Sequence, residues 1–149
     1  MSMPISRQEF EEATDLRKLK EKWVEKLRLL AERLGLKCIE EVPTNGGRVD
    51  LVWFYEFKPS IPHVSKKLPV VGFEIETSWR TRKHIKGDIF NLLELSPACG
   101  VILFLSEGFG EDSKLRGNIK AAKKYVRGFS GICRIFVWTE KEIEEIIQQ

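Results

Sequence analysis

The chain has 149 residues, 42% of them hydrophobic and 32% charged, and a formal net charge of +3, which describes one globular domain over residues 1–149. No apolar run approaches the roughly 20 residues that a membrane span needs, and the first residues lack the pattern of a signal peptide. Its three cysteines are odd in number and far apart, as in reduced intracellular proteins. We therefore expect a cytoplasmic protein with no membrane partner.

The first half of the chain is predicted to form a helix followed by three strands. Apolar residues recur at three- and four-residue spacing over residues 15–34, which predicts a long helix that Gly35 ends. Strands are predicted at residues 36–42, 48–57 and 69–77, the last two paired as a hairpin. The helix also carries basic residues with Glu21 and Glu25 between them, which indicates a solvated face. These basic residues are Arg17, Lys18, Lys20 and Lys22.

The second half alternates between helices and strands. A helix over residues 81–95 is ended by Pro97, and the wholly apolar residues 100–105 are typical of a strand covered on both faces. An amphipathic helix at 111–127 and a strand at 132–138 follow, and Thr139 opens the last helix. An early meander followed by this alternation predicts an α/β fold, with helices flanking a mixed central sheet.

Three carboxylates lie in strongly strand-like segments, namely Asp50, Glu74 and Glu76. Acidic residues are poor strand formers and are costly to desolvate, so their presence there needs a reason. Side chains alternate along a strand, so Glu74 and Glu76 share a face. In an antiparallel hairpin about the loop between these strands, the numbers of paired residues sum to about 125, which places Asp50 across from Glu74 to Glu76. Three converging carboxylates indicate an Mg²⁺ or Mn²⁺ site; a solvated sheet face or internal ion pairs are the alternative.

Asp50 on the second strand, Glu74-Ile75-Glu76 on the third and the helix that follows resemble the PD-(D/E)XK, or restriction endonuclease-like, nuclease superfamily. The resemblance covers about residues 16–138 and implies an αβββαβ core. It also implies that Asp50 and Glu74, helped by the backbone carbonyl of Ile75, bind the metal ion. The activity that it implies is hydrolysis of phosphodiester bonds.

Two positions depart from the superfamily's pattern: Val49 precedes the aspartate in place of proline, and Glu76 replaces the motif's lysine. Some restriction endonucleases carry the same Glu-x-Glu variant, which implies that Glu76 is a general base or a ligand of a second metal ion. Otherwise Lys83 or Lys86 on the next helix takes the lysine's role, or the site is inactive. We expect Asp50, Glu74 and Glu76 to be catalytic, and we assign no such role to the isolated His63 and His84.

Two groups of basic residues predict contact with nucleic acid, and a solvated charged face is the alternative for each. Cations at the start of the helix after Glu76 oppose the helix dipole but favour an anion beside the metal ion. This first group comprises Arg80, Arg82, Lys83 and Lys86. The second group recurs along one face of residues 111–127, as in proteins that neutralise phosphates. It comprises Arg116, Lys120, Lys124 and Arg127.

The leading interpretation is a metal-dependent DNA endonuclease, either structure-selective like a Holliday-junction resolvase or site-specific like a restriction enzyme. Cleaving two strands generally needs two active sites, so we expect a homodimer. The alternative is a catalytically inactive nucleic-acid-binding module that retains the nuclease fold. A third possibility is a protein-interaction domain that binds no nucleic acid.

Overall fold

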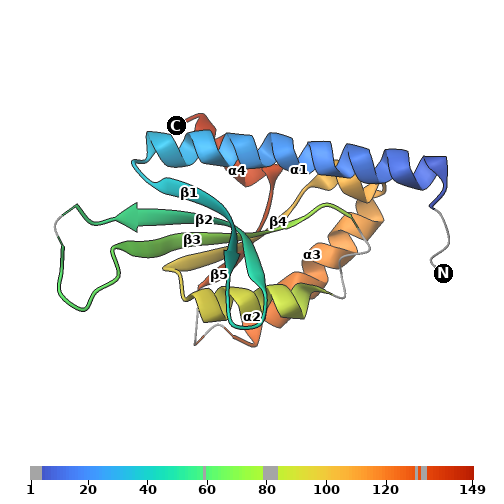
Figure 1. Ribbon diagram of the computed structural model, residues 1–149. Helices are drawn as coiled ribbons and strands as arrows, with labels where there is room; N and C mark the ends of the chain where they lie inside the picture. The colour runs from blue at the N-terminus through green and yellow to red at the C-terminus, as the bar shows by residue number, and fades with distance from the viewer. Residues whose placement is uncertain (1–4, 59, 79–83, 130, 132–133) are drawn as a thin grey trace.

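The computed structural model describes residues 5–58, 60–78, 84–129, 131 and 134–149. Within these residues the protein is mixed α/β, with five strands in one mixed sheet and four α-helices packed on its two faces (Figure 1). The elements are α1 (Arg7–Arg33), β1 (Lys37–Pro43), β2 (Arg48–Glu56), β3 (Lys67–Glu76), α2 (Ile85–Leu95), β4 (Cys99–Phe104), the 3₁₀ helix η2 (Ser106–Phe109), α3 (Asp112–Arg127), β5 (Ile135–Thr139) and α4 (Glu140–Ile147). The predicted order of helices and strands is therefore confirmed.

The sheet combines an antiparallel half with a parallel half. Its strand order is β1-β2-β3-β4-β5; β1, β2 and β3 pair antiparallel, whereas β4 and β5 continue parallel to β3. Leu51 lies opposite Phe73, which confirms the predicted antiparallel hairpin and puts Asp50 level with Glu74, at one end of the predicted range from Glu74 to Glu76. Glu76 pairs with Phe104 on the parallel side, so β3 and β4 end at the same edge of the sheet.

Each face of the sheet is covered by two helices, α1 and α4 on one and α2 and α3 on the other (Figure 1). Successive strand residues point to opposite faces, so two apolar layers form. The layer beneath α1 and α4 includes Leu27, Leu51, Phe73, Leu103 and Ile143. The layer beneath α2 and α3 includes Val52, Ile89, Leu92, Ile102 and Ala122. Two-sided covering explains the wholly apolar β4.

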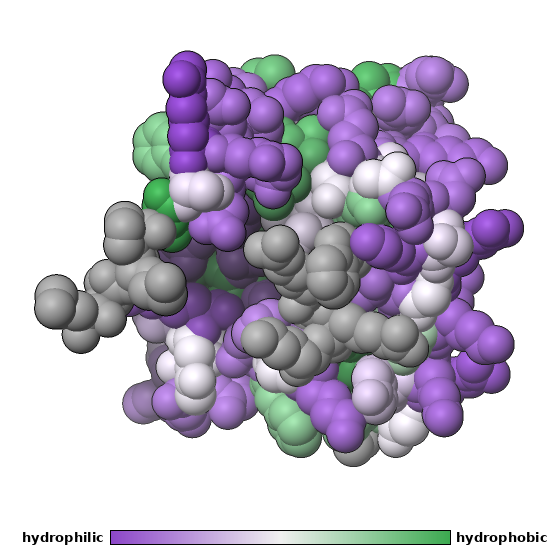
Figure 2. All heavy atoms as spheres, turned by 90° about the vertical axis from the view of Figure 1, so that its right-hand side faces the viewer, coloured by the Kyte–Doolittle hydropathy of each residue, from purple (hydrophilic) through white to green (hydrophobic). Residues whose placement is uncertain are grey.

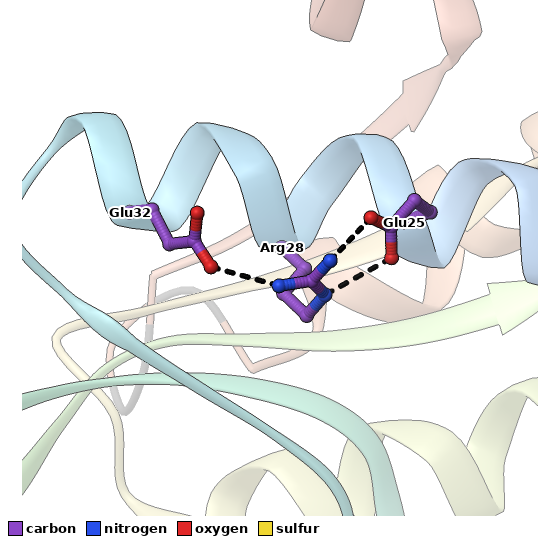
Figure 3. A network of polar contacts seen from close by, with 3 residues as sticks. All are labelled: Glu25, Arg28 and Glu32. Atoms are coloured by element: carbon purple, nitrogen blue, oxygen red, sulfur yellow. Dashed lines mark hydrogen bonds and ion pairs between the residues drawn. The ribbon is translucent and has the colours of Figure 1, made fainter.

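Helix α1 begins at Arg7, eight residues before the predicted start. Its first turns are polar and carry no apolar stripe, so hydrophobic spacing could not find them. They are held by a capping box in which the Ser6 hydroxyl accepts from the Glu9 amide and the Glu9 carboxylate accepts from the Ser6 amide. Further along α1, exposed Arg28 pairs with Glu25 and with Glu32 on the adjacent turns (Figure 3).

The segment after β4 packs tightly against the end of β3. A Cβ atom placed on Gly108 of η2 would lie 1.6 Å from the carbonyl oxygen of Thr77, the residue that follows Glu76. Leu105 donates its amide to the Glu76 carbonyl at 2.9 Å. The backbone around Glu76 is thus fixed by its neighbour in the sheet. None of the helices in the described part of the chain is long and apolar enough to cross a membrane.

Candidate metal centre

The β2–β3 ladder opens where the predicted carboxylates lie. Backbone pairing of β2 with β3 runs from Glu56 and Lys67 to Leu51 and Phe73. Beyond this point the next backbone amides donate to side chains instead of to carbonyl groups. The Ile75 amide donates to Asp50 Oδ2 at 2.7 Å, and the Asp50 amide donates to Glu74 Oε1 at 3.2 Å. Two carboxylates therefore replace carbonyl acceptors at the end of the hairpin, which holds both side chains between the strands.

A fourth carboxylate joins this cluster from α2. Asp88 lies in the first turn of that helix and makes hydrogen-bonding contacts with Glu74 and Glu76. We call Asp50, Glu74, Glu76 and Asp88 the carboxylate cluster. Glu74, Glu76 and Asp88 expose only 4%, 5% and 7% of their surface, so three acidic side chains share one buried region. The structure thus brings together the three predicted acidic residues and one more.

Sequence reasoning missed Asp88, although a signal was present. It lies three residues after Ile85 and four before Leu92, and both of these are fully buried. Residues at these spacings share a helix face, so Asp88 belongs to the buried stripe of α2. An acidic residue on an apolar stripe was as unusual as the acidic residues in the strands, and the same argument would have found it.

Burial dominates the electrostatics of the cluster. Burial, followed by repulsion from Asp50, raises the pKa of Glu74 to about 8. The pKa of Asp88 is also raised to about 8, again mainly by burial, with further contributions from Glu74 and Asp50. Desolvation and like charges both disfavour the ionised form. The metal-free cluster therefore retains protons at neutral pH that ordinary carboxyl groups would have released.

Lys20 supplies a positive charge at one side of the cluster. Its Nζ lies 3.4 Å from Asp50 Oδ1, and the two side chains are 33% and 20% exposed. Lys20 comes from α1, whereas Asp88 comes from α2 on the other face of the sheet. The expectation that Lys20 belongs to a solvated face is therefore wrong: helical periodicity placed it among charged neighbours, but α1 directs it toward the end of β2.

The predicted nucleic-acid contacts are placed in part. Arg80, Arg82 and Lys83 lie outside the described residues. The ammonium of Lys86 lies 5.0 Å from the ring centroid of Tyr125 on α3, so that side chain is directed toward α3. The four predicted basic residues of α3 are exposed, while Ala122 of the same helix is fully buried, as the amphipathic pattern predicts. The four are Arg116, Lys120, Lys124 and Arg127.

An acidic cavity lies between the start of α1 and η2, just beyond the end of β3. The end of the molecule on the right of Figure 1 is mainly hydrophilic and is hollowed (Figure 2). Helix α1 and η2 border a cavity of about 350 Å³ that also reaches Ser78, two residues after Glu76. Its acidic lining comprises Glu9, Glu12, Asp15 and Glu107. The described lining of the cavity is therefore acidic, whereas the exposed face of α3 is basic.

The donor atoms of the cluster suit a hard cation, because carboxylate oxygens are the ligands that Mg²⁺ and Mn²⁺ prefer. The Oδ2 atom of Asp88 has no hydrogen-bond partner among the described residues, and a buried oxygen of this kind is suited to a cation. In the same part of the chain, however, no three Asp, Glu, His or Cys side chains are already grouped as an ion would need. The carboxylates bind backbone amides and one another instead, so side-chain rotation has to accompany metal binding.

The isolated histidines are both exposed, and neither is near a second histidine or cysteine that would suggest a different metal site in the described residues. His84 precedes α2 as its N-cap residue, and His63 lies in the β2–β3 loop. No protein-family model, curated protein or solved structure matches this chain.

Proposed function

We propose that this protein is a metal-dependent endonuclease with a restriction endonuclease-like core, which hydrolyses DNA phosphodiester bonds at the carboxylate cluster. The observation that supports this most is the opened end of the β2–β3 hairpin. There Asp50 and Glu74 face each other across the strands, and Glu76 and Asp88 are buried beside them. Burying this much negative charge is unfavourable without counter-charge, and a divalent cation supplies it at the point where a phosphate would be attacked.

The residues divide the work according to their positions. Asp50 and Glu74, with the Ile75 carbonyl, hold the ion. Mg²⁺ or Mn²⁺ held there would supply a Lewis acid for the phosphoryl group, a lower pKa for a water molecule and a counter-charge for the leaving oxygen. Glu76, on the same face as Glu74, accepts the proton of the attacking water. The Leu105 amide bonded to the Glu76 carbonyl keeps the backbone of that base in place.

We assign to Lys20 the role of the motif's lysine, which Glu76 replaces on β3. Its ammonium is already paired with Asp50 at 3.4 Å, so it lies beside a proposed metal ligand. A fixed positive charge there favours the negative charge that develops on the phosphate during attack. Lys86 is less suited to this role, since its ammonium lies over Tyr125.

DNA is the proposed substrate because α3 presents exposed basic residues over its length. The helix follows β4 and η2, and β4 ends at the same sheet edge as Glu76, so the N-terminal end of α3 is nearest the cluster. A duplex bound along α3 would therefore extend from the cluster across the α2–α3 side of the sheet. We also propose a homodimer, because cleaving both strands needs a second active site; light scattering of the purified protein tests it.

Incubation of the full-length protein with supercoiled, linear and branched DNA in Mg²⁺ or Mn²⁺ tests the activity. We expect cleavage by the wild type and none by Asp50→Asn, which keeps the size of the side chain but removes a charge. Asp112→Asn is the matched control, because Asp112 is an exposed carboxylate in the first turn of α3. Absence of cleavage on every substrate, or equal cleavage by Asp50→Asn, would refute the proposal.

A nucleic-acid-binding module without catalysis is the second candidate. It is favoured by the present orientation of the carboxylates, which are not grouped around a common point in the described part of the chain. This candidate predicts DNA retention that neither Mg²⁺ nor Asp50→Asn changes. Comparing DNA binding with and without the metal ion therefore separates the two functions.

A further inference from the structure

The β2–β3 hairpin extends beyond the rest of the sheet as a two-stranded ribbon. Pairing of β2 with β1 stops at Phe54, and pairing of β3 with β4 starts only at Val71. The segment between these points reaches out on the left of Figure 1, beyond the end of α1. We call residues 55–58 and 60–68 the hairpin arm. A ribbon of two strands buries little apolar surface of its own, so the side chains of the arm are available to a partner.

Backbone hydrogen bonds give the arm a defined tip. The Phe57 amide donates to the Lys66 carbonyl at 2.9 Å, and the Val64 amide donates to the Ile61 carbonyl at 3.1 Å. Ile61 and Val64 are thus the first and last residues of a turn, in which His63 adopts the left-handed conformation at φ 62°. Their apolar side chains are 41% and 45% exposed, so two hydrophobic groups lie together at the tip of the arm.

The arm is also basic. Between residues 57 and 68 the sequence has three lysines and no acidic residue. Two of these lysines, Lys58 and Lys66, are exposed and flank the turn in sequence. The nearest acid along the chain, Glu56, pairs with Lys37 of β1 at 2.8 Å. The arm therefore carries a positive charge that fits an anionic partner.

The arm lies at the opposite end of β2 and β3 from the carboxylate cluster. Asp50 and Glu56 are separated by about 20 Å along β2, and the loop extends further. One turn of B-DNA spans about 34 Å, so the cluster and the arm fit within about one turn of the same duplex. Ala98, which follows α2, donates its amide to the Pro69 carbonyl at 3.2 Å, so the end of α2 meets the base of the arm. DNA that runs from the cluster along the α2–α3 side would reach this point.

We propose that the hairpin arm is a second DNA contact, in which Ile61 and Val64 insert as an apolar wedge at a base step in the minor groove while Lys58 and Lys66 bind the flanking phosphates. Apolar side chains used in this way unstack the step and kink the duplex. The arm has no Arg, Asn or Gln with which to read base edges, so it bends DNA without selecting a sequence. This inference rests on the proposed function, since it takes DNA as the partner.

Energy transfer between dyes at the two ends of a short duplex measures the bend. With the full-length protein in EDTA, and again in Mg²⁺, we expect the wild type to bend the duplex by at least about 20°. Ile61→Ser with Val64→Ser should bind the duplex without bending it. Leu29→Ser, a change of an exposed apolar residue on α1, is the matched control and should bend the duplex as the wild type does.

The salt dependence of binding tests the two lysines. Lys58→Gln with Lys66→Gln should reduce the slope by about 0.9 for each phosphate contact that is lost. Lys141→Gln, an exposed change on α4, is the control and should leave the slope unchanged. Circular dichroism checks that every variant is folded.

The outcomes separate this inference from the proposed function. A wild type that binds without bending, or bending that persists in Ile61→Ser with Val64→Ser, overturns the wedge, and an unchanged slope in the lysine variant overturns the phosphate contacts; each leaves the carboxylate cluster as proposed. No DNA binding by the wild type in either EDTA or Mg²⁺ overturns the proposed function itself. Binding of the DNA-free protein to phosphatidylserine vesicles that is lost in Ile61→Ser with Val64→Ser would overturn the DNA contact in favour of a lipid surface.

A measurement on the wild type alone decides the question should an arm variant fail to fold. Lysine acetylation is followed by mass spectrometry with and without DNA. We expect DNA to protect Lys58 and Lys66 and to leave Lys141 unprotected. Equal acetylation of Lys58 and Lys66 in both samples overturns the contact.

Discussion

Removing the buried ionisable group of Glu74 should make the stability of the metal-free protein less sensitive to pH. In Glu74→Gln the side-chain amide keeps an oxygen that can accept the backbone amide of Asp50, as Glu74 Oε1 does at 3.2 Å in the wild type. It also has an NH₂ group that can donate to Asp88. The variant therefore imitates protonated Glu74. Since Asp88 owes part of its raised pKa to Glu74, the substitution also lowers the pKa of Asp88.

The direction of the effect follows from the pKa values. Glu74 has a pKa of about 8 when folded, against an ordinary value of 4.5, so between these values the folded state holds a proton that the unfolded state has released. The free energy of unfolding therefore falls as pH rises through this window and levels off above pH 8. We count one proton for Glu74 and Asp88 together, because Glu74 opposes ionisation of Asp88, whereas the hydrogen bond with Asp88 favours ionisation of Glu74.

One retained proton changes the free energy of unfolding by about 1.4 kcal/mol per pH unit. Between pH 5 and pH 7, Glu74→Gln should thus gain about 3 kcal/mol relative to the wild type. Urea denaturation in EDTA at pH 5, 6, 7 and 8 measures this difference, with the slope m checked for constancy. Glu40→Gln, an exposed change on β1, is the control and should follow the wild type. Parallel curves for Glu74→Gln and wild type would show that Glu74 is ionised at neutral pH and that the reasoning is wrong.

Three further results are expected. Lys20→Met should lower the rate of DNA cleavage about 100-fold while leaving DNA affinity unchanged. Lys18→Met, an exposed change on the same helix, should have no effect. Equal cleavage rates for Lys20→Met and the wild type would exclude Lys20 from the site. Gly108→Ala should lower the free energy of unfolding by about 3 kcal/mol or more, measured by thermal unfolding, because the added Cβ would meet the Thr77 carbonyl. Gly117→Ala in α3 is the control: its Cβ meets no described atom, and it should raise the free energy of unfolding by about 0.5–1 kcal/mol. Lys120→Gln with Lys124→Gln should reduce the salt dependence of DNA binding by about 0.9 in slope for each phosphate that is no longer neutralised; an unchanged slope would place the DNA elsewhere.

Local patterns were enough to predict the hairpin and its register. Alternation in β2 and β3, together with the loop between them, placed Asp50 across from Glu74 to Glu76, and the structure confirms this register to within about one residue. The same holds for α4, whose start at Thr139 was given by a capping box. These features depend on residues close in sequence, where propensity and spacing act directly.

Lys20 and Asp88 show where such reasoning stops. Lys20 joins Asp50 from a helix 30 residues away in sequence, and its role depends on how α1 lies over the sheet. Asp88 is reached only when α2 packs on the opposite face. The hydrophobic spacing of a single helix does not predict which way that helix lies on the sheet. The same limit applies to the beginning of α1, where local ion pairs and a cap, without an apolar face, determine the boundary.

The two backbone amides at the open end of the hairpin offer a direct spectroscopic reading of the cluster. Most strand amides donate to carbonyl groups, but those of Asp50 and Ile75 donate to side-chain carboxylates of the proposed ligands. Their nitrogen and proton chemical shifts therefore depend on the charge and orientation of Glu74 and Asp50. In a ¹⁵N-labelled sample, these two resonances would report protonation at one pH and ion binding at another, without any substrate and without any substitution.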